Sequence, residues 1–356
     1  MDQTAPNDIR LTASEVQAVL KSLDVSKATG SDEIPARLLR ETAEVITPSL
    51  CHLFNKSLST GSIPREWKLA NIVPVYKKGE REYTENYRPI SLLPITSKVL
   101  ERCVLNNVKD WLYGLVNECQ HGFLIGKSCV TNLIEALDYI GSVLDKGGQI
   151  DTIYLDMSKA FDKVDHGLLI TKLRGMGISG SFLQWLTNYL TDRQQRVTVL
   201  GETSDTIPVT SGVPQGSLLG PVLFLLFVND LPETVISSKT SMYADDTKVF
   251  KAIKVPEDAL ALQADLTSGY DVDRNTKIRR QEEGDKKSKK GLKEEEMDRI
   301  DELCSMMQTV MKKLEMLDLI KDRILSVEQD VKSLKESINF AHAELDNLKK
   351  EMKERG

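Results

Sequence analysis

Two adjacent aspartates, Asp245 and Asp246, lie between two short β-prone stretches, residues 241–244 and 247–250. Neighbouring side chains of an ordinary strand point to opposite faces, so both carboxylates can serve one site only in the tight turn of a hairpin. The sequence therefore predicts a hairpin with the pair in its turn. Taken alone, the pair is more typical of a simple polar turn, because Asp hydrogen-bonds to its local backbone.

A third aspartate favours a shared carboxylate site over a simple polar turn. Residues 150–157 alternate and are rich in β-branched side chains, which predicts a strand that ends at Asp156, 89 residues before Asp245. A strand-end aspartate and a hairpin-turn aspartate together provide the oxygen ligands that Mg²⁺ prefers. Two such ions roughly 4 Å apart would activate a 3′-hydroxyl and stabilise a leaving pyrophosphate.

Composition divides the chain into three parts. Residues 1–268 have the pattern of a globular domain, 269–293 form a polar, lysine-rich linker, and 294–356 are predicted to form a coiled coil. Of the last 86 residues 41 are charged, and apolar residues recur at spacings of three and four from Ile300 to Met352. We expect this segment to self-associate, with the oligomer number open. A single charged helix is the alternative.

Charge and cysteine content narrow the class of protein. A net charge of −6 argues against indiscriminate binding of polyanions, although a local basic groove stays compatible with it. The five cysteines are odd in number and include no C-x-x-C pair, so a disulfide framework and a zinc module are not expected. We expect an intracellular protein of the nucleus or cytoplasm, not secreted and without a membrane partner, since no signal pattern or long apolar run occurs.

Local signals predict the boundaries of several helices. Thr12 and Glu15 form a capping box at the start of a helix. A second helix is predicted from Pro35 and is expected to break near Pro48, and a third ends at Gly61. A short helix is expected at 258–266, just before the linker.

Several motifs in order give the chain a family resemblance. Three segments resemble the successive palm motifs of reverse transcriptases from LINE-type, non-LTR retrotransposons: Asp-Met-Ser-Lys-Ala-Phe-Asp at 156–162, Gly-Val-Pro-Gln-Gly-Ser at 212–217 and Tyr-Ala-Asp-Asp at 243–246. Residues 67–79, 86–93 and 120–123 resemble the finger motifs of the same family. The resemblance covers residues 22–250, and motifs in the family's order are far more specific than any one alone.

The resemblance implies an α+β fold, with the fingers and a partial palm of a right-hand polymerase built from an antiparallel sheet with packed helices. It implies an RNA-directed DNA polymerase that uses an RNA template, a DNA primer, deoxynucleoside triphosphates and two Mg²⁺ ions, with Mn²⁺ as an alternative. Asp156 and Asp245 then match metal ligands in the catalytic site, and Asp246 completes the motif with a less defined role.

The same comparison suggests substrate-binding residues. Arg88 resembles the finger residue that grips the triphosphate, and Lys77 is a candidate helper. Phe161 matches the position that screens the sugar 2′ side, while Gln215 and Gly216 match the loop beside the nascent base pair.

Simpler roles remain open for some of these residues and their neighbours. Phe161 can be a packed aromatic, and Lys77 a solvated charge. Asp162 and Asp165 are predicted to be local caps, and His121 and His166 to be structural or exposed.

The resemblance stops after Phe250. Between residues 251 and 356 we recognise neither the primer-gripping hairpin nor the helical thumb of the family, and we expect no room for a nicking endonuclease before the fingers. The pattern is that of a truncated or rearranged element, from which we expect very weak or no processive synthesis. The alternative is a catalytically inert, retrotransposon-derived fragment that acts as a coiled-coil oligomerisation or nucleic-acid-binding protein.

Overall fold

The computed structural model describes residues 7–157 and 159–274 of the 356-residue chain. The helices of this part are α1 (Ala13–Lys21), α2 (Ala36–Glu41), α3 (Ala43–Thr60), α4 (Ile95–Gly114), α5 (Cys129–Leu144), α6 (His166–Gly175), α7 (Gly180–Leu190), α8 (Gly220–Phe227) and α9 (Pro256–Arg274). The strands are β1 (Leu69–Tyr76), β2 (Tyr87–Leu92), β3 (Gln149–Leu155), β4 (Arg193–Val199), β5 (Glu202–Thr203), β6 (Ile207–Val209), β7 (Lys239–Tyr243) and β8 (Asp246–Ile253).

Local capping signals explain two helix boundaries. The Thr12 side chain accepts a hydrogen bond from the Glu15 N–H, and the Glu15 carboxylate accepts one from the Thr12 N–H at 2.7 Å, so the predicted capping box is confirmed. Gly61 ends α3 in the left-handed conformation, with φ of 63°, as a C-terminal glycine commonly does.

The prediction of a helix break near Pro48 is wrong. The break lies at Thr42, between α2 and α3, and Pro48 lies inside α3. Pro48 is exposed and stands less than two turns from the start of α3. Its missing N–H removes one bond to the Glu44 carbonyl, which water can replace on an exposed face, so the helix continues.

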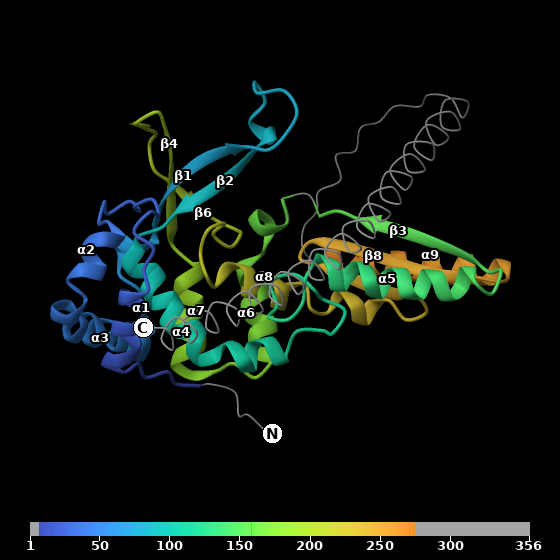
Figure 1. Cartoon of the computed structure of the whole chain (residues 1–356), viewed down its shortest axis with the longest axis horizontal. Helices are drawn as coiled ribbons and strands as arrows, with labels where there is room; N and C mark the ends of the chain where they lie inside the picture. Colours follow the sequence, from blue (N-terminus) through green and yellow to red (C-terminus); the bar gives the residue numbers. More distant parts are fainter. Residues whose placement is uncertain (1–6, 158, 275–356) are drawn as a thin grey trace, which may run out of the picture. The chain divides into compact units, whose positions relative to one another are not determined.

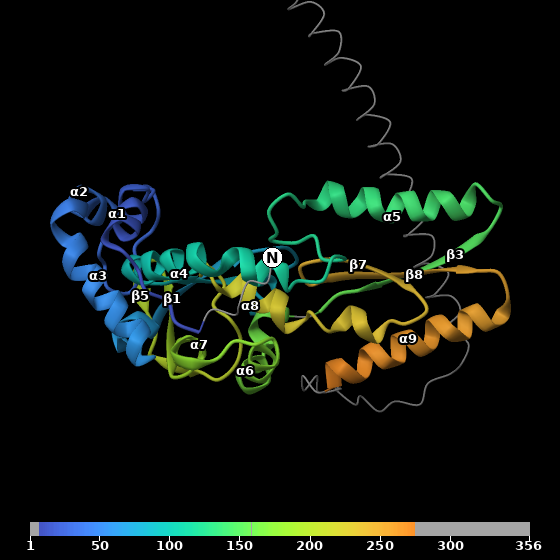
Figure 2. The same ribbon diagram turned by 90° about the horizontal axis from the view of Figure 1, so that it is seen from below.

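Strands β3, β8 and β7 form a three-stranded antiparallel sheet in that order. Helix α5 covers one face of this sheet and α9 the other, as Figure 2 shows with the sheet between them. The predicted hairpin at 241–250 corresponds to β7 and β8. The predicted antiparallel sheet with packed helices is therefore confirmed for this part of the fold.

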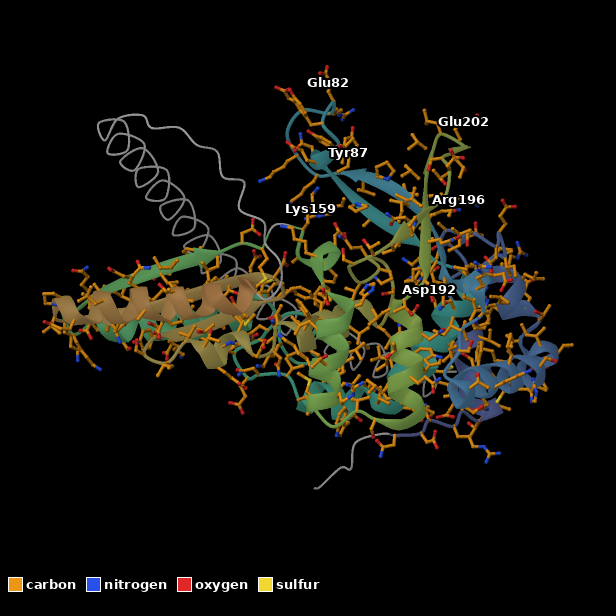
Figure 3. All side chains as sticks on the ribbon, turned by 180° about the vertical axis from the view of Figure 1, so that it is seen from behind. Glu82, Tyr87, Lys159, Asp192, Arg196 and Glu202 are labelled. Carbon is orange, nitrogen blue, oxygen red and sulfur yellow. The ribbon has the colours of Figure 1, made fainter. Side chains whose placement is uncertain are left out.

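A second sheet contains β2, β1, β4 and β5 in order, with β6 also paired to β4 (Figure 1). Strands β1 and β2 are antiparallel, but β1 and β4 are parallel, with Leu69 opposite Gln194. The expected antiparallel sheet does not describe this second sheet completely, because the β1–β4 pair in it is parallel. Figure 3 shows Glu82 and Glu202 at the two ends that project from this sheet.

Helices α4, α7 and α8 pack together in the hydrophobic core. Every residue of α8 except Pro221 is buried. Trp185 of α7 stacks on Tyr189 with ring centroids 5.7 Å apart, and its Nε1 donates to Ser57 Oγ of α3 at 3.1 Å. These contacts give the elements around the candidate site a rigid support.

The C-terminal predictions lie mostly outside the described residues. Helix α9 is longer than the expected 258–266 and continues to Arg274. The rest of the predicted linker and the coiled coil at 294–356 lie outside the described residues. Within residues 7–157 and 159–274, no helix combines the length and the apolar character that crossing a membrane requires.

Candidate active site

The β7–β8 hairpin positions the aspartate pair. Tyr243 pairs with Asp246, so Ala244 and Asp245 alone form the two-residue turn. The prediction that both aspartates lie in the turn is thus wrong for Asp246, which is the first residue of β8. Ala244 has φ of 56°, an uncommon conformation for a residue with a side chain.

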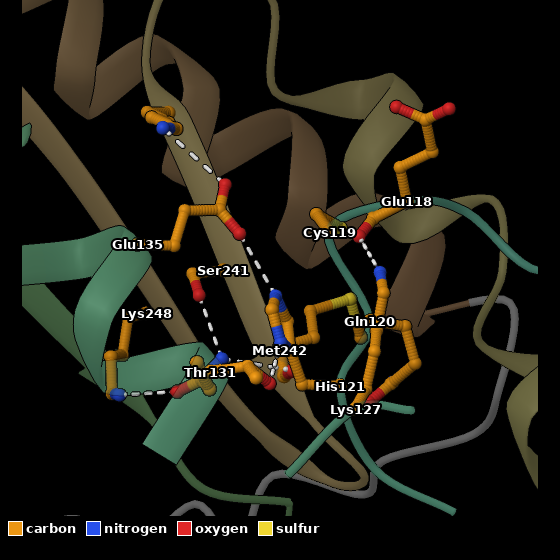
Figure 4. A network of polar contacts seen from close by, with 12 residues as sticks. Glu118, Cys119, Gln120, His121, Lys127, Thr131, Glu135, Ser241, Met242 and Lys248 are labelled. Atoms are coloured by element: carbon orange, nitrogen blue, oxygen red, sulfur yellow. Dashed lines mark hydrogen bonds and ion pairs between the residues drawn. The ribbon is translucent and has the colours of Figure 1, made fainter. Parts of the chain in front are cut away.

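Gln120 supports this turn (Figure 4 shows the surrounding network). Its Oε1 accepts hydrogen bonds from the N–H groups of Ala244 and Gly122, each at 2.8 Å. Its Nε2 donates to the Ala244 carbonyl at 3.2 Å. Because Gln120 is buried, water competes little for these hydrogen bonds, and they hold Ala244 in its strained conformation.

The segment that contains Gln120 also packs directly on the turn. A Cβ atom on Gly122 would lie 2.3 Å from the Ala244 nitrogen, so only glycine fits there. The neighbouring His121 is buried and hydrogen-bonds with Thr131 Oγ1 and Glu135 Oε2, both at 2.8 Å. His166 Nε2 contacts the Gly212 carbonyl at 2.7 Å. Both histidines are structural, as predicted.

Asp156 directly follows β3, whose last pair with β8 joins Leu155 to Thr247. In this register, Asp156 lies at the same end of the sheet as Asp246, the first residue of β8. Burial raises the pKa of Asp245, and the charges of Asp246 and Asp156 raise it further. A backbone hydrogen bond and the charge of Lys77 oppose that rise. The charges of Asp246 and Asp156 therefore act on Asp245 at one end of the sheet.

The chemistry of this donor set fits a divalent cation. Asp156 and Asp246 are exposed and Asp245 is half-buried, so solvent reaches the hard oxygen ligands of all three. Among the described residues, no three side chains of the metal-binding types are close enough together to form a complete ligand cluster. A cation would relieve the repulsion by Asp246 and Asp156 that adds to the effect of burial on the pKa of Asp245.

The loop at 212–217 lies between the two sheets. The Gln215 carbonyl accepts from the Ser91 N–H of β2 at 2.7 Å, and a Cβ on Gly216 would lie 2.6 Å from the Ser91 oxygen. Gln215 Nε2 donates to Asp162 Oδ1 at 2.9 Å. Asp162 thus orients Gln215 and is not the predicted local cap.

Asp165 does cap a helix, as predicted. Its side chain accepts a hydrogen bond from the Leu168 N–H at 2.8 Å at the start of α6.

Phe161 is a packed aromatic in this structure. Its ring stacks on Phe224 of α8, with centroids 4.5 Å apart, and meets Phe123 edge-on at 6.0 Å. Phe161 is only partly buried, so part of the ring stays accessible to solvent. Packing and a contact with substrate are compatible here.

Arg88 and Lys77 lie on the β1–β2 hairpin. Arg88 is exposed and pairs with Val75, and neither cation makes an ion pair within the described part of the chain. The charge of Lys77 opposes the rise in the pKa of Asp245, as the weakest of the contributions to it. No such effect of Arg88 on Asp245 is found.

Sequence reasoning missed the polar residues that support the site. Gln120 lies in a finger motif that assigns it no role, and Asn132 of α5 carries no motif; its Nδ2 donates to Ser241 Oγ at 2.7 Å. Glu101 of α4 was also missed. It occupies a position on the apolar stripe of the helix, beside Leu100 and Val104, and a charge at such a position is a recognisable signal.

The comparisons with known proteins agree with this geometry. The family model described as reverse transcriptase (RNA-dependent DNA polymerase) matches residues 75–271, beyond Phe250, where the recognised motifs end. The RNA-directed DNA polymerase from mobile element jockey of Drosophila melanogaster is 31% identical over 255 residues, which are 68% of this chain and 28% of the relative. Its counterpart in Drosophila funebris is 30% identical over 268 residues, 71% of this chain and 29% of the relative.

A third relative is the Retrovirus-related Pol polyprotein from type-1 retrotransposable element R1 of Bradysia coprophila. It is 28% identical over 257 residues, 68% of this chain and 24% of the relative. The chain thus spans between 24% and 29% of the length of these three relatives. Together with the family match, these similarities extend over the finger and palm elements, and the chain belongs to the reverse transcriptase (RNA-dependent DNA polymerase) family.

Proposed function

We propose that this reverse transcriptase domain transfers deoxynucleotides from their triphosphates to a primer 3′-hydroxyl, with RNA as the template. One observation carries the proposal: Asp156, Asp245 and Asp246 interact at one end of the β3–β8–β7 sheet. In this reaction a bond forms between the 3′-oxygen and the α-phosphorus while pyrophosphate leaves. Extension of an oligo(dT) primer on poly(rA) tests the proposal.

Asp156, Asp245 and Asp246 are the residues that would hold the metal ions. Carboxylate oxygens suit Mg²⁺, and Mn²⁺ is the alternative, since both prefer oxygen ligands. When bound, two such ions would favour ionisation of the 3′-hydroxyl and departure of pyrophosphate. The pKa of Asp245 supports this role: burial raises it most, and the charges of Asp246 and Asp156 add a repulsion that a cation would relieve.

The cations of the β1–β2 hairpin would bind the triphosphate. The Arg88 guanidinium can bind phosphate oxygens through two parallel hydrogen bonds, and it is exposed on β2. Lys77 lies within electrostatic range of Asp245, which supports a role as a second, weaker phosphate contact. The loop with Gln215 and Gly216 would lie beside the nascent base pair.

Phe161 would select deoxynucleotides by occupying the space that a 2′-hydroxyl needs. Phe161→Val is therefore expected to lower the ratio of kcat/KM for dTTP over UTP by about tenfold or more. Primer extension with each nucleotide measures this ratio. Phe182→Val in the α7 core is the control, since it weakens packing away from the site. An unchanged ratio in Phe161→Val would leave Phe161 with a packing role alone.

The apolar repeat from Ile300 to Met352 favours a second function, self-association through a coiled coil. Leu317→Lys with Leu334→Lys places two charges on the repeat, and we expect the sedimentation coefficient of the full chain to fall to that of a monomer. Ser333→Lys adds a charge beside the repeat and is expected to leave association intact. A wild-type chain that sediments as a monomer would exclude this function.

A further inference from the structure

Glu101 is the most deeply buried carboxylate near the site and has no role in the proposed reaction. It lies on α4, is 1% exposed, and its Oε2 accepts hydrogen bonds from the N–H groups of Leu218 at 2.7 Å and Leu219 at 3.2 Å. Its Oε1 has no hydrogen-bond partner in the described residues. A buried carboxylate of this kind is a poor source of stability, because its desolvation offsets much of what its bonds contribute.

The two N–H groups that Glu101 binds lie just after Gln215 and Gly216, with Ser217 between them. Pro214 to Gly220 form one compact turn, in which the Ser217 Oγ accepts from the Gly220 N–H at 2.9 Å. Asp162 and Ser91 hold the start of this turn, through Gln215. Glu101 holds its end, so the segment at 214–219 is fixed from α4 as well as from β2 and the palm.

The same carboxylate lies at the N-terminus of α8, which begins at Gly220. A negative charge is favourable there, because the N–H groups of the first turn point toward it. Helix α8 carries Phe224, whose ring stacks on Phe161. Glu101 therefore constrains the loop before α8 and the contact that Phe224 of α8 makes with Phe161.

A buried arginine accompanies Glu101. Arg193 is 3% exposed, its Nη1 donates to the Tyr189 carbonyl at 3.0 Å, and its guanidinium lies 5.1 Å from the centre of the Tyr189 ring. Its charge acts on Glu101, although the two are too far apart for a direct ion pair. Arg193 begins β4, so the pair of charges also connects α4 with the sheet that contains β1 and β2.

We propose that Glu101 is a positioning residue for nucleotide binding: its carboxylate fixes the segment at 214–219, and with it Gln215, Gly216 and the Phe224–Phe161 contact. This inference rests on the proposed function. Burial raises the pKa of the Glu101 carboxyl, while the two N–H groups and the charge of Arg193 oppose that rise. One carboxyl oxygen that accepts from two consecutive N–H groups fits a demand for fixed geometry rather than for stability. Loss of Glu101 is then expected to weaken nucleotide binding more than it lowers the stability of the fold.

The test compares three variants of the full chain. In Glu101→Ala, hydrogen exchange at the Leu218 and Leu219 amides is expected to accelerate at least about tenfold, because both lose a charged acceptor. The KM for dTTP is expected to rise about tenfold, with a smaller change in kcat. Glu101→Gln keeps an acceptor oxygen and is expected to restore most of both properties. Val104→Ala, which removes a buried side chain one turn along α4, is the control for lost packing.

Two results would overturn the inference. One is exchange at Leu218 and Leu219 in Glu101→Ala that equals the wild-type rate. The other is an equal rise in KM in Val104→Ala at the same loss of thermal stability. If the unmodified chain extends no primer, the proposed function fails, and the exchange rates still decide whether Glu101 fixes the segment.

Discussion

Asp245→Asn is expected to reduce nucleotide addition to a primer by at least about a thousandfold, because it removes a negatively charged metal ligand from the reacting centre. The backbone of the turn should stay intact, since Gln120 binds Ala244 rather than Asp245. Asp151→Asn is a matched control: Asp151 lies on β3 and pairs with Lys251, well along the sheet from the turn. That variant should keep its activity.

The same substitution should not destabilise the fold. The folded protein holds the Asp245 proton more tightly than the unfolded chain does, because the pKa of Asp245 is raised in the fold. Its contribution to the free energy of unfolding therefore decreases as the pH rises from the ordinary carboxyl pKa through the raised one. At neutral pH, Asp245→Asn removes this unfavourable charge. We expect its thermal midpoint at pH 7 to equal or exceed that of the wild type.

Two results for the Asp245→Asn variant would contradict these expectations, one in its activity and one in its stability. Activity close to that of the wild type would mean that Asp245 is not a ligand. A large fall in the thermal midpoint at pH 7 would mean that the carboxylate stabilises the turn, contrary to the direction of its pKa shift.

Gly122→Ala is expected to have the second largest effect. Its new Cβ would lie 2.3 Å from the nitrogen and 2.9 Å from the Cα of Ala244, and backbone atoms cannot move aside as a flexible side chain can. The turn that carries Asp245 must shift by roughly an ångström, which can lower the rate about a hundredfold. Overpacking should also lower the free energy of unfolding by about 1–3 kcal/mol.

Gly141→Ala is the control for Gly122→Ala. Gly141 lies within α5, and a Cβ there would meet nothing within 4 Å. Because alanine favours a helix interior, this variant should gain about 0.5–1 kcal/mol and keep its activity. Denaturant unfolding and primer extension measure both variants. Wild-type activity in Gly122→Ala would show that the turn does not depend on this contact.

Much of the local structure can be predicted from the sequence. The capping box at Thr12 and the glycine at 61 mark helix ends through hydrogen bonds and backbone freedom that depend on neighbouring residues. Strand β3 and the β7–β8 hairpin follow from alternation and from a polar turn. For the same reason, the local pattern of residues is enough to locate Asp156 and Asp245 at strand ends.

Most of the predictions that were wrong or missing concern interactions between distant parts of the chain. The parallel pairing of β1 with β4 joins segments more than a hundred residues apart, which no local pattern reveals. Gln120 binds Ala244, and Asp162 binds Gln215, through contacts that only the assembled fold creates. Pro48 continues a helix because its exposed position lets water satisfy the carbonyl that the proline leaves without a partner.

Extension of a labelled oligo(dT) primer on poly(rA), with wild type and Asp245→Asn side by side, tests the catalytic role of the three aspartates most directly. We predict that the wild-type chain adds dTMP in the presence of Mg²⁺, in short products, and that addition disappears without a divalent cation and in Asp245→Asn. No addition by the folded wild type with either Mg²⁺ or Mn²⁺, or addition that persists in Asp245→Asn, would contradict the assignment of Asp156, Asp245 and Asp246 as the catalytic site.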